Sequence, residues 1–107
     1  MFNKYLILGT VNFGVKYGFR NKQFSQKEIF SILNFSKKNN IEYLDTAELY
    51  GKSEAKIGKF NWGKKIYTKI SIPEGKFFNI KEELQKRFNN SLIKLNSKSV
   101  YGIYIHN

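Results

Sequence analysis

Four short apolar runs alternate with helix-like segments along a chain of only 107 residues. Each run has the length of a strand and is bounded by turn residues or by a segment with helical spacing. Strands that alternate with helices favour a parallel sheet, because a parallel pair needs a long crossover between its two strands. We expect the strands at Tyr5–Gly9, Ile41–Ala47, Lys65–Ile70 and Val100–His106. The first run is closed by glycine and is consistent with a buried strand.

Helical segments are expected in the three intervals between these strands. Ser25 and Glu28 have the spacing of a capping box. The helix that follows them should end at Asn39-Asn40, because asparagine tolerates the left-handed backbone found at many helix ends. We expect a short helix at Ser53–Phe60 and a long helix after Asn79, whose side chain can cap it.

The resulting order is β-α-β-α-β-α-β, and we expect the segment Val11–Phe24 to be a loop because it contains two glycines and several polar residues. Two α/β architectures fit this order: an open doubly wound sheet, or half of a (β/α)8 TIM barrel. A half barrel would leave its concave face and its two edge strands open, because the side chains and strands that normally cover them are absent.

The formal net charge of +11 comes mainly from lysine: 17 of the 19 basic residues are lysines, and only Arg20 and Arg87 are arginines. Nucleic-acid surfaces often use the arginine fork, clustered with aromatic residues on one face. Scattered lysines on helices are typical of an ordinary solvated surface. A nucleic-acid-binding protein is therefore the weakest of the functions considered, and we expect no nucleic-acid partner.

The chain contains no cysteine, which excludes disulfides, thiolate catalysis and cysteine zinc sites, and we expect no metal. The apolar run Tyr5–Leu8 is too short for the core of a signal peptide or for a membrane span. We expect a soluble cytoplasmic protein with no membrane partner.

Four polar side chains occupy equivalent places at the carboxyl ends of the expected strands. Asp45 ends the second strand and Tyr50 follows it in the loop, while Lys69 ends the third strand and His106 ends the fourth. In parallel β/α folds the loops at this end of the sheet build the binding site. Because adjacent strands lie about 5 Å apart, we expect these side chains to meet.

Such a group suits proton delivery to a carbonyl oxygen. A phenol is a poor proton donor at neutral pH, and an ammonium beside it stabilises the phenolate. The ammonium needs a carboxylate partner, and Asp45 fits that role. Taken singly, each residue has an ordinary explanation: Asp45 can cap a loop, Tyr50 can pack, and Lys69 is one of 17 lysines. The function is indicated by their coincidence at successive strand ends.

These residues lie in a pattern that resembles the aldo-keto reductases over essentially the whole chain. The most specific part is Asp45-Thr46-Ala47, then Tyr50-Gly51 and Ser53-Glu54. Weaker parts agree in order and spacing: Leu8-Gly9-Thr10, Thr68-Lys69, Ser91-Leu92 with Leu95, and Ile105-His106-Asn107.

The resemblance implies a (β/α)8 barrel that reduces aldehydes, ketones or sugars with NADPH, or with NADH in some members. It implies that Tyr50 is the general acid, that Lys69 and Asp45 tune the acidity of its hydroxyl, and that His106 orients the carbonyl. It also places four residues near the nicotinamide end of the cofactor: Gly9, Thr10, Val11 and Asp45.

A complete barrel of this kind needs at least about 200 residues. We therefore expect residues 1–107 to be a single truncated aldo-keto reductase domain with four strands and three helices. The resemblance assigns most of the cofactor site to the second half of the barrel, so we expect the isolated chain to bind NADPH weakly or not at all. The chain could be a relic, could pair with a separately encoded C-terminal half, or could self-associate. The main alternative to an enzyme is a catalytically silent half barrel that binds or regulates a partner.

Overall fold

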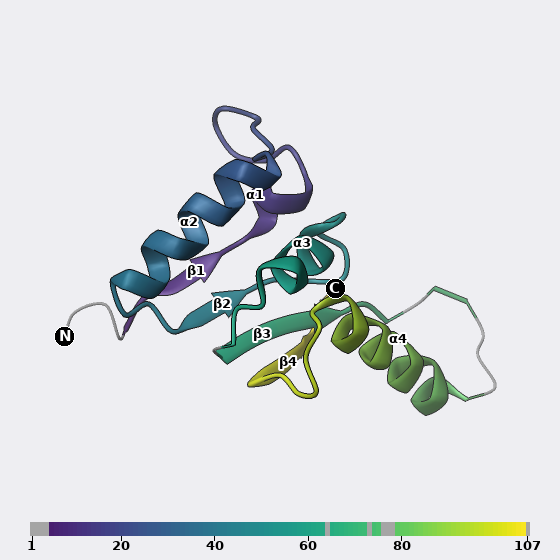
Figure 1. Ribbon diagram of the computed structural model, residues 1–107. Coiled ribbons are helices and arrows are strands. Elements are labelled where there is room, and N and C mark those ends of the chain that lie inside the picture. Colours follow the sequence, from purple (N-terminus) through teal and green to yellow (C-terminus); the bar gives the residue numbers. More distant parts are fainter. Residues whose placement is uncertain (1–4, 64, 73, 76–78, 107) are drawn as a thin grey trace.

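A computed structural model describes residues 5–63, 65–72, 74–75 and 79–106. Within these ranges the chain forms a four-stranded parallel sheet in the order β1-β2-β3-β4, with four helices (Figure 1). The strands are β1 (Ile7–Gly9), β2 (Tyr43–Asp45), β3 (Lys65–Ile70) and β4 (Gly102–Ile105). The helices are α1 (Val11–Gly14), α2 (Gln26–Lys38), α3 (Ser53–Phe60) and α4 (Ile80–Lys94).

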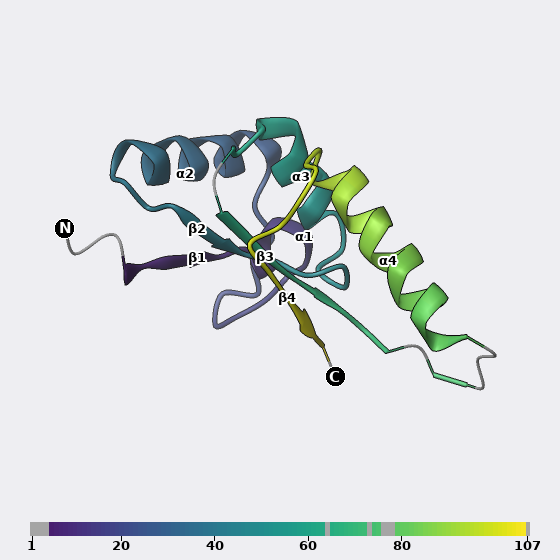
Figure 2. The same ribbon diagram turned by 90° about the horizontal axis from the view of Figure 1, so that it is seen from below.

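The predicted α/β fold is confirmed, and its arrangement is that of part of a barrel. The strands follow one another across the sheet in chain order, without the order reversal of a doubly wound sheet. The longer helices α2, α3 and α4 lie on one face, and no helix in the described part covers the other (Figure 2). None of the helices in this part is long and apolar enough to cross a membrane.

The local signals at the helix ends are confirmed. The Ser25 hydroxyl accepts a hydrogen bond from the Glu28 amide, and the Glu28 carboxylate accepts one from the Ser25 amide. Helix α2 ends at Lys38, and Asn40 takes the left-handed backbone with φ of 60°. The Asn79 side chain caps α4 by accepting from the Glu82 amide. These contacts satisfy backbone amides that have no partner within the helix.

The prediction was wrong in two places. The expected loop at Val11–Phe24 begins with the short helix α1, which buries Phe13; a single turn is too short to show helical periodicity. The first apolar run is not a buried strand: Tyr5 lies open, and Ile7 is 55% exposed because it shares the uncovered face with its partner Tyr43. Only Asn107 of the motif residues falls outside the described residues.

The core lies between the sheet and its helices. Alternate residues of β2 and β3 point into this layer, so Leu44 and Ile66 are buried in one cluster with residues of α2 and α3. Trp62 closes the layer at the amino ends of the strands and donates its indole N–H to the Glu42 carbonyl at 3.2 Å. The buried cluster comprises Phe13, Ile29, Leu33, Leu44, Ile57, Trp62, Ile66 and Leu95.

The uncovered face carries tyrosines where the interior of a barrel is usually filled by branched aliphatic residues. The Tyr67 ring stacks on Tyr43 at 6.0 Å and lies edge-on to Tyr101 at 5.3 Å. Tyr104 approaches the same ring at 5.8 Å. This tyrosine cluster is partly open to solvent, and its hydroxyl groups favour polar surroundings over a dry core.

We predict that Gly58→Ala destabilises the chain. Alanine is favoured over glycine inside a helix by about 1 kcal/mol. Here the added Cβ would lie 2.0 Å from the Lys94 carbonyl oxygen, where α3 meets the end of α4. Because the obstacle is backbone, the overpacking cost of about 1–3 kcal/mol should exceed the gain. Thermal unfolding followed by circular dichroism would measure the loss.

Gly9→Ala is the matched control, since a Cβ at Gly9 meets nothing within 4 Å. Its melting temperature should stay close to that of the wild type. A melting temperature for Gly58→Ala at or above the wild-type value would show that the two helices do not pack as closely as described.

Candidate active site

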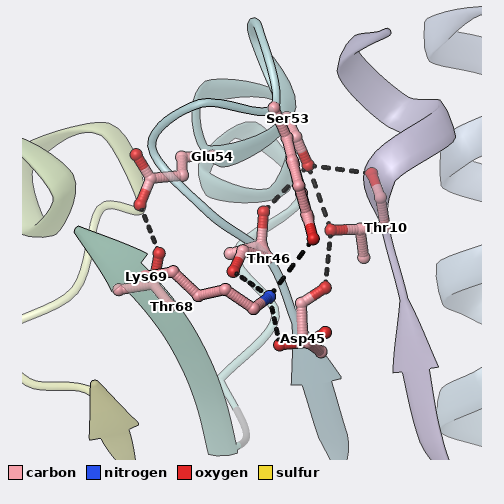
Figure 3. Close-up of polar contacts among 8 residues, drawn as sticks. Thr10, Asp45, Thr46, Ser53, Glu54, Thr68 and Lys69 are labelled. Carbon is pink, nitrogen blue, oxygen red and sulfur yellow. Dashed lines mark hydrogen bonds and ion pairs between the residues drawn. The ribbon is translucent and has the colours of Figure 1, made fainter. Parts of the chain in front are cut away.

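The Lys69 ammonium is the centre of the site (Figure 3). It donates to Asp45 Oδ1 at 2.7 Å, to the Thr46 carbonyl at 3.1 Å and to the Tyr50 hydroxyl at 3.3 Å. An ammonium group has three N–H donors, so these three bonds use all of them. The Lys69 side chain is only 17% exposed, and the Asp45 carboxylate balances its charge.

The Tyr50 hydroxyl acts as an acceptor toward Lys69, because an ammonium can only donate. Its own hydrogen is therefore left to be donated elsewhere. Among the residues that the structure describes, no acceptor receives that hydrogen. A phenol held in this way can present its O–H to a molecule that enters the site.

His106 also lies against Tyr50. Its backbone amide donates to the Ile70 carbonyl at 2.9 Å, which extends the pairing of β3 and β4 and places the side chain at the strand ends. The imidazole ring meets the Tyr50 ring edge-on, with 5.7 Å between centroids. His106 Nδ1 is buried and has no hydrogen-bond partner within the described part of the chain. Nε2 is therefore the nitrogen that the ring can offer to a ligand.

The strand register brings these groups to one edge. Gly9 pairs with Asp45 across β1 and β2, and Lys69 pairs with Tyr104 across β3 and β4. Directly paired residues in a parallel sheet point to the same face. All four of the residues predicted from the sequence to form the catalytic group, Asp45, Tyr50, Lys69 and His106, are brought together at the carboxyl edge.

A buried hydroxyl network ties the first two strand ends to α3. The Ser53 hydroxyl lies 3.0 Å from the Thr46 hydroxyl and donates toward Thr10 (Figure 3). The Thr10 hydroxyl in turn donates to the Asp45 carbonyl at 2.9 Å. Because all three hydroxyl groups are buried, each needs these partners. The network fixes the start of α3, and with it the end of the loop that carries Tyr50.

Two glycines let this loop lie directly on α1. A Cβ at Gly14 would sit 1.5 Å from the Tyr50 carbonyl oxygen, and one at Gly51 would sit 2.4 Å from the Gly14 carbonyl oxygen. Gly51 also has φ of 56°, which favours glycine. The glycine after Tyr50 in the sequence motif therefore has a physical reason, and its counterpart is Gly14, to which the sequence reasoning gave no role.

Glu54 is a buried carboxylate behind the site. It is 2% exposed and accepts from the Thr68 hydroxyl at 2.8 Å and the Ser91 hydroxyl at 3.1 Å. Burial raises the pKa of Glu54, and the two hydroxyl hydrogen bonds oppose that rise only in part. The residue braces α3 against β3 and α4, directly beside the backbone of Lys69. The sequence motif identified Glu54 as part of the family pattern, but it did not indicate that Thr68 and Ser91 would be its partners.

The residues expected near a cofactor lie in different surroundings. Gly9 lines an open cleft of about 380 Å³ together with Asp45 and Lys69. The Thr10 side chain instead points inward and is buried in the hydroxyl network. Val11 is half-buried as the first residue of α1. The remaining walls of the cleft are apolar or aromatic: Ile7, Tyr67 and Tyr104.

Comparison with known proteins agrees with this geometry. The family model described as "Aldo/keto reductase family" matches residues 5–107. An aldo-keto reductase structure from Pseudomonas aeruginosa is 25% identical with a TM-score of 0.75, over 94% of this chain and 42% of that one. A second structure from the same organism is 26% identical with a TM-score of 0.73, over 94% of this chain and 40% of that one.

The fold is also shared with the holo form of an aldo-keto reductase from Bacillus halodurans. It is 22% identical with a TM-score of 0.69, over 94% of this chain and 35% of that one. A comparison with curated proteins finds no match. The chain belongs to the aldo/keto reductase family, whose members generally use nicotinamide cofactors. It spans between 35% and 42% of the length of these solved relatives.

We predict that Glu54→Gln flattens the pH dependence of stability. The folded carboxyl has a pKa above its usual value of 4.5, so the folded state holds this proton more tightly than the unfolded state. The stability from Glu54 is therefore complete below about pH 4.5 and is lost as pH rises through the raised pKa. Glutamine is neutral at every pH. The melting temperature of Glu54→Gln should therefore exceed that of the wild type by a margin that grows as the pH rises toward neutral.

Glu28→Gln is the opposing control. The hydrogen bond from Lys22 lowers the pKa of Glu28, so its contribution is present above the unfolded value and is lost as pH falls. Its variant should therefore lose stability relative to the wild type at neutral pH. If Glu54→Gln instead tracked the wild type across this range, Glu54 would not be buried as described.

Proposed function

We propose that this chain supplies the catalytic half of an NADP(H)-dependent oxidoreductase that reduces aldehyde, ketone or sugar carbonyls, with NAD(H) as the alternative cofactor. The observation that supports this most is the Tyr50 hydroxyl, which accepts from Lys69 at 3.3 Å and keeps its own hydrogen for donation. Family membership supports the same chemistry. A cytoplasmic location belongs to this proposal.

The residues of this chain would deliver the proton that the carbonyl oxygen takes up during reduction. When bound, a nicotinamide cofactor supplies hydride to the carbonyl carbon. Tyr50 would donate its hydroxyl proton to the carbonyl oxygen, and the Lys69 ammonium would stabilise the phenolate that remains. Asp45 would hold Lys69 in place and balance its charge. His106 Nε2 would hydrogen-bond the carbonyl oxygen and orient it toward Tyr50.

The residues present fit the reactive end of such a cofactor. Gly9 has free space in front of it, since an added Cβ would meet no atom within 4 Å, and it borders the cleft beside Asp45 and Lys69. A flat ring could therefore lie against this strand end. Thr10 would contribute through its backbone, because its hydroxyl is already bonded within the protein, and Val11 would border the same end.

We predict that Tyr50→Phe lowers the rate of carbonyl reduction by about 10²–10⁴-fold, because it removes the proton donor and keeps the ring. The assay follows NADPH absorbance with a panel of aldehydes. It is run on the chain alone and on a fusion to the part of the Pseudomonas aeruginosa protein that follows the matched region.

Tyr17→Phe is the matched control, since Tyr17 is an exposed tyrosine in the segment after α1. It should keep the wild-type rate. Equal rates for wild type and Tyr50→Phe would contradict the proposed role of Tyr50. If the wild-type sequence reduced no aldehyde, either as the chain alone or in the fusion, the second candidate function would be favoured.

That second candidate is a catalytically silent half barrel that binds a partner. It is favoured by the exposed side chains at both edges of the sheet, at Ile7 on β1 and Ile103 and Ile105 on β4. Edge strands with free backbone groups readily pair with another chain. The partner would be a separate C-terminal half of the barrel or a second copy of this chain.

We predict that the purified chain elutes from gel filtration as a species larger than its mass of 12.6 kDa. Open strand edges and an uncovered face would drive association. Light scattering at the column outlet would give the mass directly. A single monomeric peak with a sharp, cooperative melt would contradict this expectation.

A further inference from the structure

Glu48 lies in the turn that carries Tyr50. The Tyr50 amide donates to the Ala47 carbonyl at 3.1 Å and closes the turn around Glu48. The Glu48 amide donates to the Lys69 carbonyl at 3.0 Å, which continues the pairing between β2 and β3 past the strand ends. The backbone of Glu48 therefore joins the two segments that bring the Tyr50 hydroxyl and the Lys69 ammonium together.

The Glu48 side chain also joins the Tyr50 turn to the segment that follows Lys69. Its Oε1 atom accepts from the Ser71 amide at 2.8 Å, two residues beyond Lys69, and from Arg87 Nη1 on α4 at 3.0 Å. The side chain is only 13% exposed. A carboxylate with so little access to water gains more from an ion pair than one on the open surface, and it resists displacement.

Arg87 is unusual in this chain. Lysine supplies 17 of the 19 basic residues, and Arg87 is one of two arginines. Its Nη1 atom contacts Glu48 while its Nε atom contacts Glu83 on the same helix at 3.2 Å. The hydrogen bond that Arg87 donates to Glu48 is the main cause that raises the pKa of Arg87. Only the planar guanidinium holds two carboxylates in a fixed geometry, whereas a lysine offers a single mobile charge.

We propose that Glu48, anchored by Arg87, is a positioning residue that sets the approach of the Tyr50 hydroxyl to the Lys69 ammonium. This inference rests on the proposed role of Tyr50 as proton donor. The contacts form a clamp of three residues, Glu48, Ser71 and Arg87, which joins the start of the Tyr50 turn to the end of β3 and to α4, whereas the hydroxyl network of Ser53 holds the end of that turn. The Tyr50 turn is thereby held at both of its ends.

The test measures the geometry directly by nuclear Overhauser contacts in solution. Lys69 Nζ lies 4.9 Å from the centroid of the Tyr50 ring, so a cross-peak between the Lys69 ε-methylene and that ring is expected in the wild type. Such a cross-peak falls steeply with distance. The cross-peak between the Tyr67 and Tyr101 rings, whose centroids are 5.3 Å apart within the tyrosine cluster, reports whether the sheet is intact.

We predict that Glu48→Ala abolishes the Tyr50–Lys69 cross-peak and retains the Tyr67–Tyr101 cross-peak. Arg87→Lys should weaken the first cross-peak and retain the second, since a lysine keeps the charge without the fork. Glu83→Gln is the matched control: it removes the charge of the other carboxylate that contacts Arg87 and should retain both cross-peaks.

Retention of both cross-peaks in Glu48→Ala would overturn the proposal. If Glu48→Ala lost both because it failed to fold, Arg87→Lys would decide: selective weakening of the Tyr50–Lys69 cross-peak supports the clamp, and retention of both overturns it. Loss of both cross-peaks in both variants would also overturn it, because the contacts would then support the whole sheet.

Activity provides a separate reading in the fusion protein. A positioning role predicts that Glu48→Gln lowers kcat and leaves KM near the wild-type value, because the substrate contacts remain. A wild-type fusion without reductase activity would count against the proposed function, and the cross-peaks would still test the clamp. The two failures are therefore distinguishable.

Discussion

The three hydrogen bonds of the Lys69 ammonium are the constraint on which the site depends. Each N–H of the group has its own partner, on β2, on the residue after β2 and in the Tyr50 turn. These partners can be met only if β3 lies directly beside β2 and the turn folds back over the strand end. A half-buried ammonium that lost one partner would have to find water or move, so the charge itself favours a single arrangement of the loop.

The rest of the scaffold serves that arrangement from several directions. Gly14 and Gly51 allow two backbone segments to touch, and the Ser53 hydroxyl ties the start of α3 to the first two strand ends. The Glu54 carboxylate reaches from α3 to β3 and α4. A buried carboxylate with a raised pKa destabilises the fold when it is ionised. Glu54 offsets this cost by accepting hydrogen bonds from β3 and from α4.

The uncovered face of the sheet separates this chain from a closed barrel. The solved relatives are more than twice as long as the portion that the chain covers. Where a closed barrel would pack branched aliphatic side chains, this face presents the rings of Tyr43, Tyr67 and Tyr104, with Ile7 beside them. Surfaces of this kind associate readily, and this is why activity and assembly have to be examined together for this chain.

The sequence by itself determined the helix caps and the bounds of two elements, Ser53–Phe60 and Lys65–Ile70, because these follow from local spacing. It also determined that the catalytic candidates gather at one edge, because the carboxyl ends of parallel strands meet there. Only the tertiary structure decided that α1 forms, that Glu54 is buried, and that Glu48 meets Arg87. Those partners lie up to 39 residues apart, and no local pattern encodes which distant side chain will complete a hydrogen bond.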